Sequence, residues 1–269
     1  TLHNIKVTAR GQYIGGLTGL ARGTVADVTL TGDVTYDESS GNTTYGSEVI
    51  NEGNYEGTGG LIGMPYGALE NLKVSGLHVK GYTYVGGVSG RINENTNQNI
   101  QVGDENLTTA DGAKVPFGVF VEGRTYISGV ASRGTSDGYS TTVNYFKNVK
   151  VQNVRISASN DGAYGIGAVC QVEDSEVSGC DIYAATSHAA GVVRDWNTVY
   201  RTTVKDTKIS SGNNVGGIGT YGLSAVDCTV SGCTITGNKY VGGVLGLSYN
   251  STINSTGVVD SFIGTENAS

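Results

Sequence analysis

Long apolar runs and positive charge are both scarce in this sequence. No stretch of about 18 consecutive apolar residues occurs, so no membrane-spanning helix is expected. Lysine and arginine number 17 against 24 aspartate and glutamate residues, which gives a net charge of −7 at pH 7. This balance disfavours non-specific binding to nucleic acid or to an anionic membrane. The first residues, TLHNIKVTAR, contain neither an initiator methionine nor an apolar signal core, so we expect a soluble chain that is a mature protein or an excised fragment.

Histidine is also rare, and its placement excludes one class of catalytic site. A zinc peptidase of the His-Glu-x-x-His type needs two histidines one helical turn apart, with a carboxylate base between them. His3, His78 and His188 are isolated from one another, and we expect His78 to be an outward side chain on a strand. The acidic residues from Asp104 to Asp111 lack the spacing of a known calcium loop. We therefore predict neither a metal ion nor another cofactor.

Glycine, by contrast, is abundant, and much of it falls in one repeated phrase. Of the 43 glycines, two pairs occur in the sequence YVGGV, at residues 84–88 and again at 240–244. Glycine weakens a strand, so a repeated Gly-Gly within valine-rich runs must serve a backbone requirement that recurs. Eight variants of the phrase occur, at a spacing of about 26 residues where no insertion intervenes: 14–17, 58–61, 85–88, 127–130, 166–169, 189–192, 215–218 and 241–244.

A second signature follows the first in most units. It begins with valine and ends five residues later with valine or isoleucine, as in VSGLHV (74–79), VQNVRI (151–156) and VSGCTI (230–235). Residues five apart face opposite sides of a regular strand, so a turn between them must reset the alternation. The third residue is glycine, asparagine or aspartate, which are typical turn residues. Each unit therefore reads as strand, turn and strand, with both apolar ends pointing inward.

These regularities predict an all-β fold, a right-handed parallel β-helix or β-solenoid of about eight coils. Each coil has about 26 residues, and neighbouring coils lie about 4.8 Å apart. An antiparallel sandwich is the alternative, but it favours hairpin turns and irregular spacing. We expect a single domain over residues 1–269, with insertions at about 37–57, 91–115 and 133–145.

The cysteines are expected to be free thiols. Cys180 and Cys233 fall in the same inward position two coils apart, a separation of about 9.6 Å that exceeds the reach of a disulfide. Cys170 and Cys228 are interpreted in the same way, as small buried apolar residues.

The phrase YVGGVxG, followed by a strand that ends in IxG, resembles the GLUG-type repeat. That repeat is found in bacterial surface proteins, in adhesins and in regions flanking the catalytic part of some IgA-specific endopeptidases. The resemblance covers nearly the whole chain outside the insertions, but it departs at Ala189-Ala190-Gly191 and in the final segment NSTINSTGVVDSFIG. It implies a surface-located β-helix, and no peptidase activity is carried over because the zinc motif is missing.

Two insertions point to a candidate binding strip. Measured against the coil that begins at Val215, the coil beginning at Val85 has 16 extra residues before Pro116, and the next coil has 9 extra before Val151. Both are expected to leave the rod at the same corner, while the insertion 37–57 leaves at another. Loops on a rigid scaffold often carry binding residues, and exposed aromatic rings stack on sugars or anchor proteins. The alternative is that these rings only cover the ends of the apolar core. The candidate residues are Trp196, Tyr221, Tyr139, Arg133, Tyr66, Tyr200 and Tyr249.

The functional expectation is a non-catalytic, adhesin-like binding or spacer module, extracellular or on the bacterial cell surface, within a larger secreted or anchored protein. Its partner would be a host protein or glycan, and the module is expected to be monomeric, without nucleic-acid binding or membrane insertion. The alternative is a β-helical glycan-cleaving enzyme or a phage-type tailspike domain. That alternative is disfavoured because one outward position changes character from coil to coil, as a solvated face does: Lys73, Lys150, Glu176, Thr203 and Thr229.

The alternation of inward and outward residues makes a direct prediction. Val204→Asp should lower the free energy of unfolding by several kcal/mol, because it buries an unpaired carboxylate, whereas Thr203→Asp should change it by about 0.5 kcal/mol or less. Thermal denaturation of the two variants measures the difference. Equal melting temperatures would show that the assigned alternation is wrong.

Overall fold

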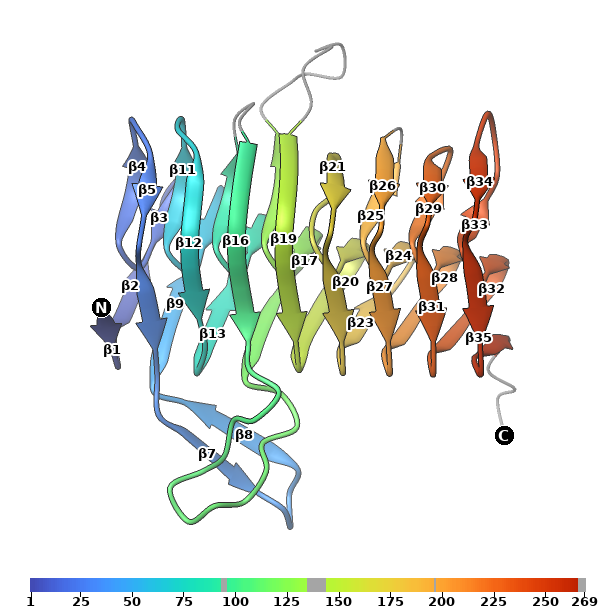
Figure 1. The fold of residues 1–269 in the computed structure, drawn as a ribbon. Coiled ribbons are helices and arrows are strands. Elements are labelled where there is room, and N and C mark those ends of the chain that lie inside the picture. The colour runs from blue at the N-terminus through green and yellow to red at the C-terminus, as the bar shows by residue number, and fades with distance from the viewer. Residues whose placement is uncertain (93–95, 135–143, 196, 266–269) are drawn as a thin grey trace.

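The rod consists of parallel coils stacked in one direction. The computed structural model describes residues 1–92, 96–134, 144–195 and 197–265, and these form strands and turns without a helix. In Figure 1 the strands of each coil lie beside the equivalent strands of the next, from the N-terminal to the C-terminal end. Among the described residues, the antiparallel pairings are one hairpin and the bridge between Thr108 and Lys114. The predicted parallel β-helix is therefore confirmed.

Three faces run along the rod. The first is a 14-stranded sheet: β1 (Leu2–His3), β5 (Val25–Ala26), β6 (Thr29–Thr31), β12 (Leu69–Val74), β16 (Thr96–Gly103), β19 (Asn144–Gln152), β21 (Cys170–Glu173), β22 (Glu176–Ser178), β26 (Thr198–Tyr200), β27 (Thr203–Lys205), β30 (Ser224–Val226), β31 (Thr229–Ser231), β34 (Thr252–Asn254) and β35 (Gly257–Val259). The second is a 13-stranded sheet: β2 (Lys6–Ala9), β3 (Ile14–Gly15), β9 (Ser47–Asn51), β10 (Glu56–Gly59), β13 (Leu77–Lys80), β14 (Thr83–Gly86), β17 (Val119–Ser128), β20 (Val154–Tyr164), β23 (Asp181–Ala184), β24 (Ser187–Ala190), β28 (Lys208–Gly216), β32 (Thr234–Gly242) and β36 (Phe262–Gly264).

The third face is formed by a four-stranded and a three-stranded sheet that isolated bridges at Gly167 connect. Its strands are β4 (Thr18–Ala21), β11 (Ile62–Pro65), β15 (Ser89–Ile92), β18 (Ala131–Gly134), β25 (Val193–Asp195), β29 (Gly219–Tyr221) and β33 (Leu245–Leu247). The remaining strands, β7 (Val34–Asp37) and β8 (Asn42–Tyr45), form a hairpin outside the rod.

The core is built from identical positions in successive coils. Val177, Val204 and Val230 pair in register in the first sheet, and all three are fully buried. Ile209 and Ile235 continue in the second sheet in the same way. The second signature therefore contributes inward residues at both ends, as predicted. Its turn residues have the positive φ expected of a tight turn: Gly76 (63°), Asn153 (52°), Gly179 (61°), Asp206 (50°) and Gly232 (61°).

The Gly-Gly phrase places a glycine where the backbone of the next coil leaves no room for a Cβ. The amide of Gly217 donates a hydrogen bond to Gly242 O at 3.3 Å, and a Cβ on Gly217 would lie 2.1 Å from Gly243 O. Similarly, a Cβ on Gly87 would lie 2.2 Å from Gly129 O. No side chain fits at that separation. The members of this glycine column are Gly16, Gly60, Gly87, Gly129, Gly165, Gly191, Gly217 and Gly243.

One copy of the phrase was assigned to the wrong residues. The expected copy at 166–169 is replaced in the structure by residues 163–166, because Ala163 pairs with Ile127 and Ala189. The sequence obscures this copy because Tyr164 stands where most other copies have their first glycine. Gly165 keeps the column position, where a Cβ would lie 1.8 Å from Gly191 O.

The second insertion also lies elsewhere than expected. β16 occupies the middle of the segment 91–115, and Val102, rather than Pro116, pairs with Val74 and Val151. The inserted residues of this coil are those between β16 and β17. These residues separate Val102 from Val119, so the second signature of this coil is not contiguous in the sequence and was not recognised there.

This insertion leaves the rod at the corner where hairpin β7–β8 also leaves (Figure 1). The expectation that it shares a corner with the segment 133–145 is therefore wrong. That segment runs from the end of β18 to the start of β19, at the opposite edge of the first sheet, and residues 135–143 lie outside the described part of the chain.

The two insertions at this corner pack together as a lateral lobe. Val34 and Tyr45 of the hairpin form a small buried cluster with Val115. His78, on the intervening coil, lies between the hairpin and the next coil of the rod: its ring centroid is 6.0 Å from that of Tyr45 in β8 and 5.1 Å from that of Phe120 in β17. His78 is therefore outward, as predicted, but its side chain is only 20% exposed, and its Nε2 is 3.1 Å from Glu122 Oε1.

All four cysteines are free and buried, as expected. Cys180 and Cys233 are separated by one coil, in which Thr207 takes the same position, and the amide of Cys180 donates to the Thr207 hydroxyl. The thiols of Cys180 and Cys233 each contact the carbonyl oxygen of the residue two positions earlier, at 3.2 Å. At this position a cysteine thiol makes the same contact that the Thr207 hydroxyl makes with the carbonyl oxygen of Lys205. Burial raises the pKa of Cys180 to about 12, which suppresses its reactivity as a thiolate.

The glycine column gives the second prediction. Gly217→Ala should destabilise the rod by about 2 kcal/mol or more, because the new methyl group forces two coils apart. Gly257→Ala is the control, since a Cβ at Gly257 meets nothing within 4 Å. In thermal denaturation, Gly217→Ala should melt at least about 4 °C below the wild type, and similar melting points for the two variants would contradict the argument.

Candidate functional site

The residues of the predicted aromatic strip fall in different parts of the structure. Tyr66 follows β11, Tyr221 ends β29 and Tyr249 follows β33, so these three lie where the third face passes into the first sheet. Tyr200 instead ends β26 within the first sheet, paired with Glu173. Trp196 and Tyr139 lie outside the described residues. Arg133 lies in β18, opposite Arg91 of β15.

Two members of the strip form a contact. The rings of Tyr221 and Tyr249 stack with centroids 6.0 Å apart and planes 5° apart, and Tyr249 is 55% exposed. Tyr66 lies beside a hollow lined by Arg22 and Gly23, several coils away. The strip as a binding surface remains a prediction.

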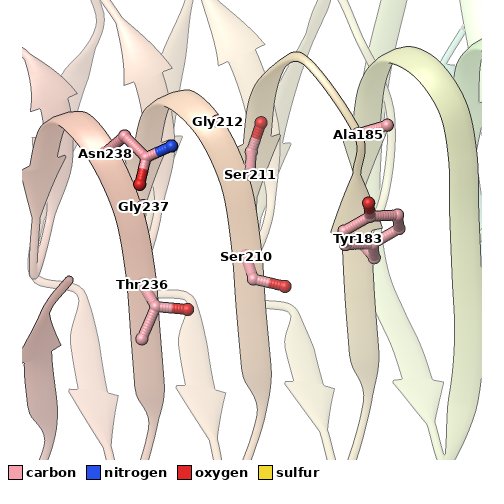
Figure 2. A pocket seen from close by; sticks show the side chains of 8 residues that line it. All are labelled: Tyr183, Ala185, Ser210, Ser211, Gly212, Thr236, Gly237 and Asn238. Carbon is pink, nitrogen blue, oxygen red and sulfur yellow. The ribbon is translucent and has the colours of Figure 1, made fainter. Parts of the chain in front are cut away.

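An exposed tyrosine of the second sheet borders a hollow, and sequence reasoning did not single it out. Tyr183 is 45% exposed and borders a hollow of about 220 Å³ that crosses β23, β28 and β32, which we term the Tyr183 furrow (Figure 2). Its lining residues are Tyr183, Ala185, Ser210, Ser211, Gly212, Thr236, Gly237 and Asn238.

Strand register explains the shape of the furrow. Tyr183, Ser210 and Thr236 are paired residues of three successive coils, so their side chains form one outward row with a spacing of about 4.8 Å. Two residues further along each strand, the equivalent outward positions hold Ala185, Gly212 and Asn238. Because the first two have little or no side chain, a hollow remains between Tyr183 and Asn238, as Figure 2 shows.

A cluster at the neighbouring corner contains serine, histidine and aspartate, but not in the geometry of a catalytic triad. His188 Nδ1 lies 2.8 Å from Asp161 Oδ1, and the Ser187 hydroxyl also contacts Asp161, at 3.1 Å. A triad needs the serine on the opposite ring nitrogen, Nε2. Here Nε2 faces the Asn214 amide nitrogen at 3.1 Å, and Ser187 Oγ instead lies 3.0 Å from Nδ1, the same nitrogen that contacts Asp161.

The electrostatics of this cluster favour a structural ion pair. Burial alone would raise the pKa of Asp161, but the hydrogen bond and charge of His188, with a further hydrogen bond from Ser187, lower it below its ordinary value of 3.8. The cluster joins β20, β24 and β28, which are strands of three successive coils.

Carboxylates of the first sheet are also engaged in pairing. Glu173 lies between Lys147, at 3.6 Å, and Arg201, while Glu176 lies 3.2 Å from Lys205. Within residues 1–92, 96–134, 144–195 and 197–265, no three histidine, cysteine, aspartate or glutamate side chains converge in a way that could hold a metal ion.

Comparisons with known proteins add no family assignment: no protein-family model matches the chain, and no curated protein matches it. Among the described residues, the structure contains no helix with the length and apolar character that crossing a bilayer requires.

The Asp161–His188 pair gives a pH-dependent prediction. The lowered pKa of Asp161 means that its contribution to stability is complete above the ordinary value of 3.8 and is lost as the pH falls through the lower folded-state value. At pH 7, Asp161→Asn should cost about 1 kcal/mol, or about 2–4 °C in melting temperature. The difference from wild type should shrink below pH 4.

Asp227→Asn is the control, because it makes the same chemical change at an exposed position. The backbone φ of Asp227 is positive, and asparagine tolerates this conformation. A melting-temperature difference for Asp161→Asn that stays constant from pH 7 to pH 3 would contradict the assigned ion pair.

Proposed function

We propose that this chain is a non-catalytic, adhesin-like binding or spacer module of a larger secreted or surface-anchored bacterial protein, acting outside the cell. The observation that carries the proposal is the in-register stacking of inward residues along the rod. It extends from the pair Leu2 and Leu30 at the N-terminal end to the pair Ile235 and Ile263 at the C-terminal end. Such a core holds surface groups at fixed separations, which is the property that a spacer or a display scaffold needs.

The partner is proposed to be a host protein or a glycan, bound by a monomeric module. Exposed aromatic rings on a rigid frame support this proposal, because little conformational entropy is lost when they bind. The stacked pair Tyr221 and Tyr249 lies at one edge of the rod, and Tyr183 lies on the second sheet.

The proposal is tested by binding and by cleavage assays on the same protein. The folded chain should bind at least one ligand on glycan or host-protein arrays, and incubation with mixed polysaccharides should release no new reducing ends. If the predicted strip is the site, then the triple variant Trp196→Ala, Tyr221→Ala and Tyr139→Ala should weaken binding at least about tenfold.

The control for the strip is Tyr55→Ala, which removes a tyrosine of similar exposure, 48%, from elsewhere on the rod. Unchanged binding by a folded triple variant would reject the strip. Release of reducing ends would favour the glycan-cleaving alternative, and a folded chain that binds nothing would remove the binding function.

A further inference from the structure

We infer that the Tyr183 furrow is a subsite for one uncharged sugar ring. This assignment rests on the proposed binding function and specifies its ligand class and location. The furrow combines an exposed aromatic face with hydroxyl and amide groups at close range, and Figure 2 shows these groups around a common hollow.

The aromatic part of the site is Tyr183. A pyranose ring has an apolar face of C–H groups, which packs against an aromatic ring, and a rim of hydroxyl groups that need hydrogen-bonding partners. The Tyr183 ring is 45% exposed, and its row neighbour Ser210 is too small to cover it. The ring is therefore available as a platform.

The polar part of the site is supplied by the next two coils. Ser210 presents a hydroxyl along one side, and Asn238 presents an amide at the far end of the hollow. Thr236 also lines the hollow, but it is only 2% exposed. Ser211 alternates with outward Ser210 and pairs in register with Ala184 of the core, so its side chain points inward and does not belong to the polar rim of the site.

The charge distribution selects for an uncharged ligand. None of the eight lining residues is ionisable near neutral pH. Charged residues border the furrow on this face: Asp181 pairs with Arg155 at 3.7 Å, Lys208 lies in register with Asp181, and the Lys239 ammonium lies 4.6 Å from the centre of the Tyr240 ring. An anionic sugar would lose hydration in the furrow, whose lining residues include no cationic side chain.

The size of the furrow limits the ligand to about one ring. Its volume of about 220 Å³ is below the roughly 300–1,000 Å³ of sites for drug-sized ligands. A single shallow subsite of this kind should bind with a Kd on the order of 1 mM.

The test is saturation-transfer NMR on the folded chain with the methyl glycosides of glucose, galactose, mannose and N-acetylglucosamine, and with sialic acid as the anionic comparison. At least one neutral sugar should show contact, and sialic acid should bind more weakly. Tyr183→Ala should weaken neutral-sugar binding about tenfold, and Tyr183→Phe, which keeps the ring, should stay within about threefold of wild type.

Two further variants separate loss of the site from loss of the fold. Ala185→Gln fills the hollow from an exposed position and should weaken binding as much as Tyr183→Ala does, while Tyr55→Ala should leave binding unchanged. All variants should melt close to wild type because the altered side chains are exposed.

The inference is overturned if no neutral sugar shows contact, or if folded Tyr183→Ala binds like wild type. Either result, together with retained binding on the glycan or host-protein arrays, rejects the furrow while keeping the proposed module function. A folded chain that binds neither on the arrays nor in the NMR experiment rejects both the furrow and the binding role of the module.

Discussion

The close approach of backbones at the glycine column is the constraint on which the structure depends. Successive coils hydrogen-bond there through main-chain groups, and a Cβ on Gly191 or Gly217 would lie 2.1 Å from the next carbonyl oxygen. Because every coil must fit this separation, the column fixes the register of the chain on either side of it. On the other faces, valine then stacks on valine and isoleucine on isoleucine in successive coils. Side chains of the same shape can fill the interior at the close packing that protein cores require.

A fixed interior leaves variation to the outward positions. Along the row that contains Tyr183, successive coils present Glu122, Ser157, Tyr183, Ser210 and Thr236 at a spacing of about 4.8 Å. Charge therefore gives way to small polar residues along one face, although the backbone repeats. A local surface property can arise on such a rod by exchanging one or two side chains per coil, without any change in the fold.

Sequence reasoning recovered what repeats and missed what depends on neighbours in space. The alternation of Val204 and Thr203, the turn residues and the cysteine positions could be predicted because each recurs with the coil. The copy at residues 163–166 was misplaced because the buried Tyr164 stands where most other copies have their first glycine. The furrow left no local signal: it exists because Ala185 and Gly212, 27 residues apart, both lack bulk beside Tyr183.

The lateral lobe shows why insertions occur where they do. The turns of the second signature lie outside the core, so a coil can be extended there while its inward residues, such as Val102 and Val119, keep their pairing. Two insertions on non-adjacent coils would leave an outward residue between them exposed to both. His78 occupies that position, and its ring packs against those of Tyr45 and Phe120. Its Nε2 lies 3.1 Å from Glu122 Oε1. His78 therefore joins the hairpin to the rod, and Phe120 of the rod packs against the cluster of Val34, Tyr45 and Val115 that links the two insertions.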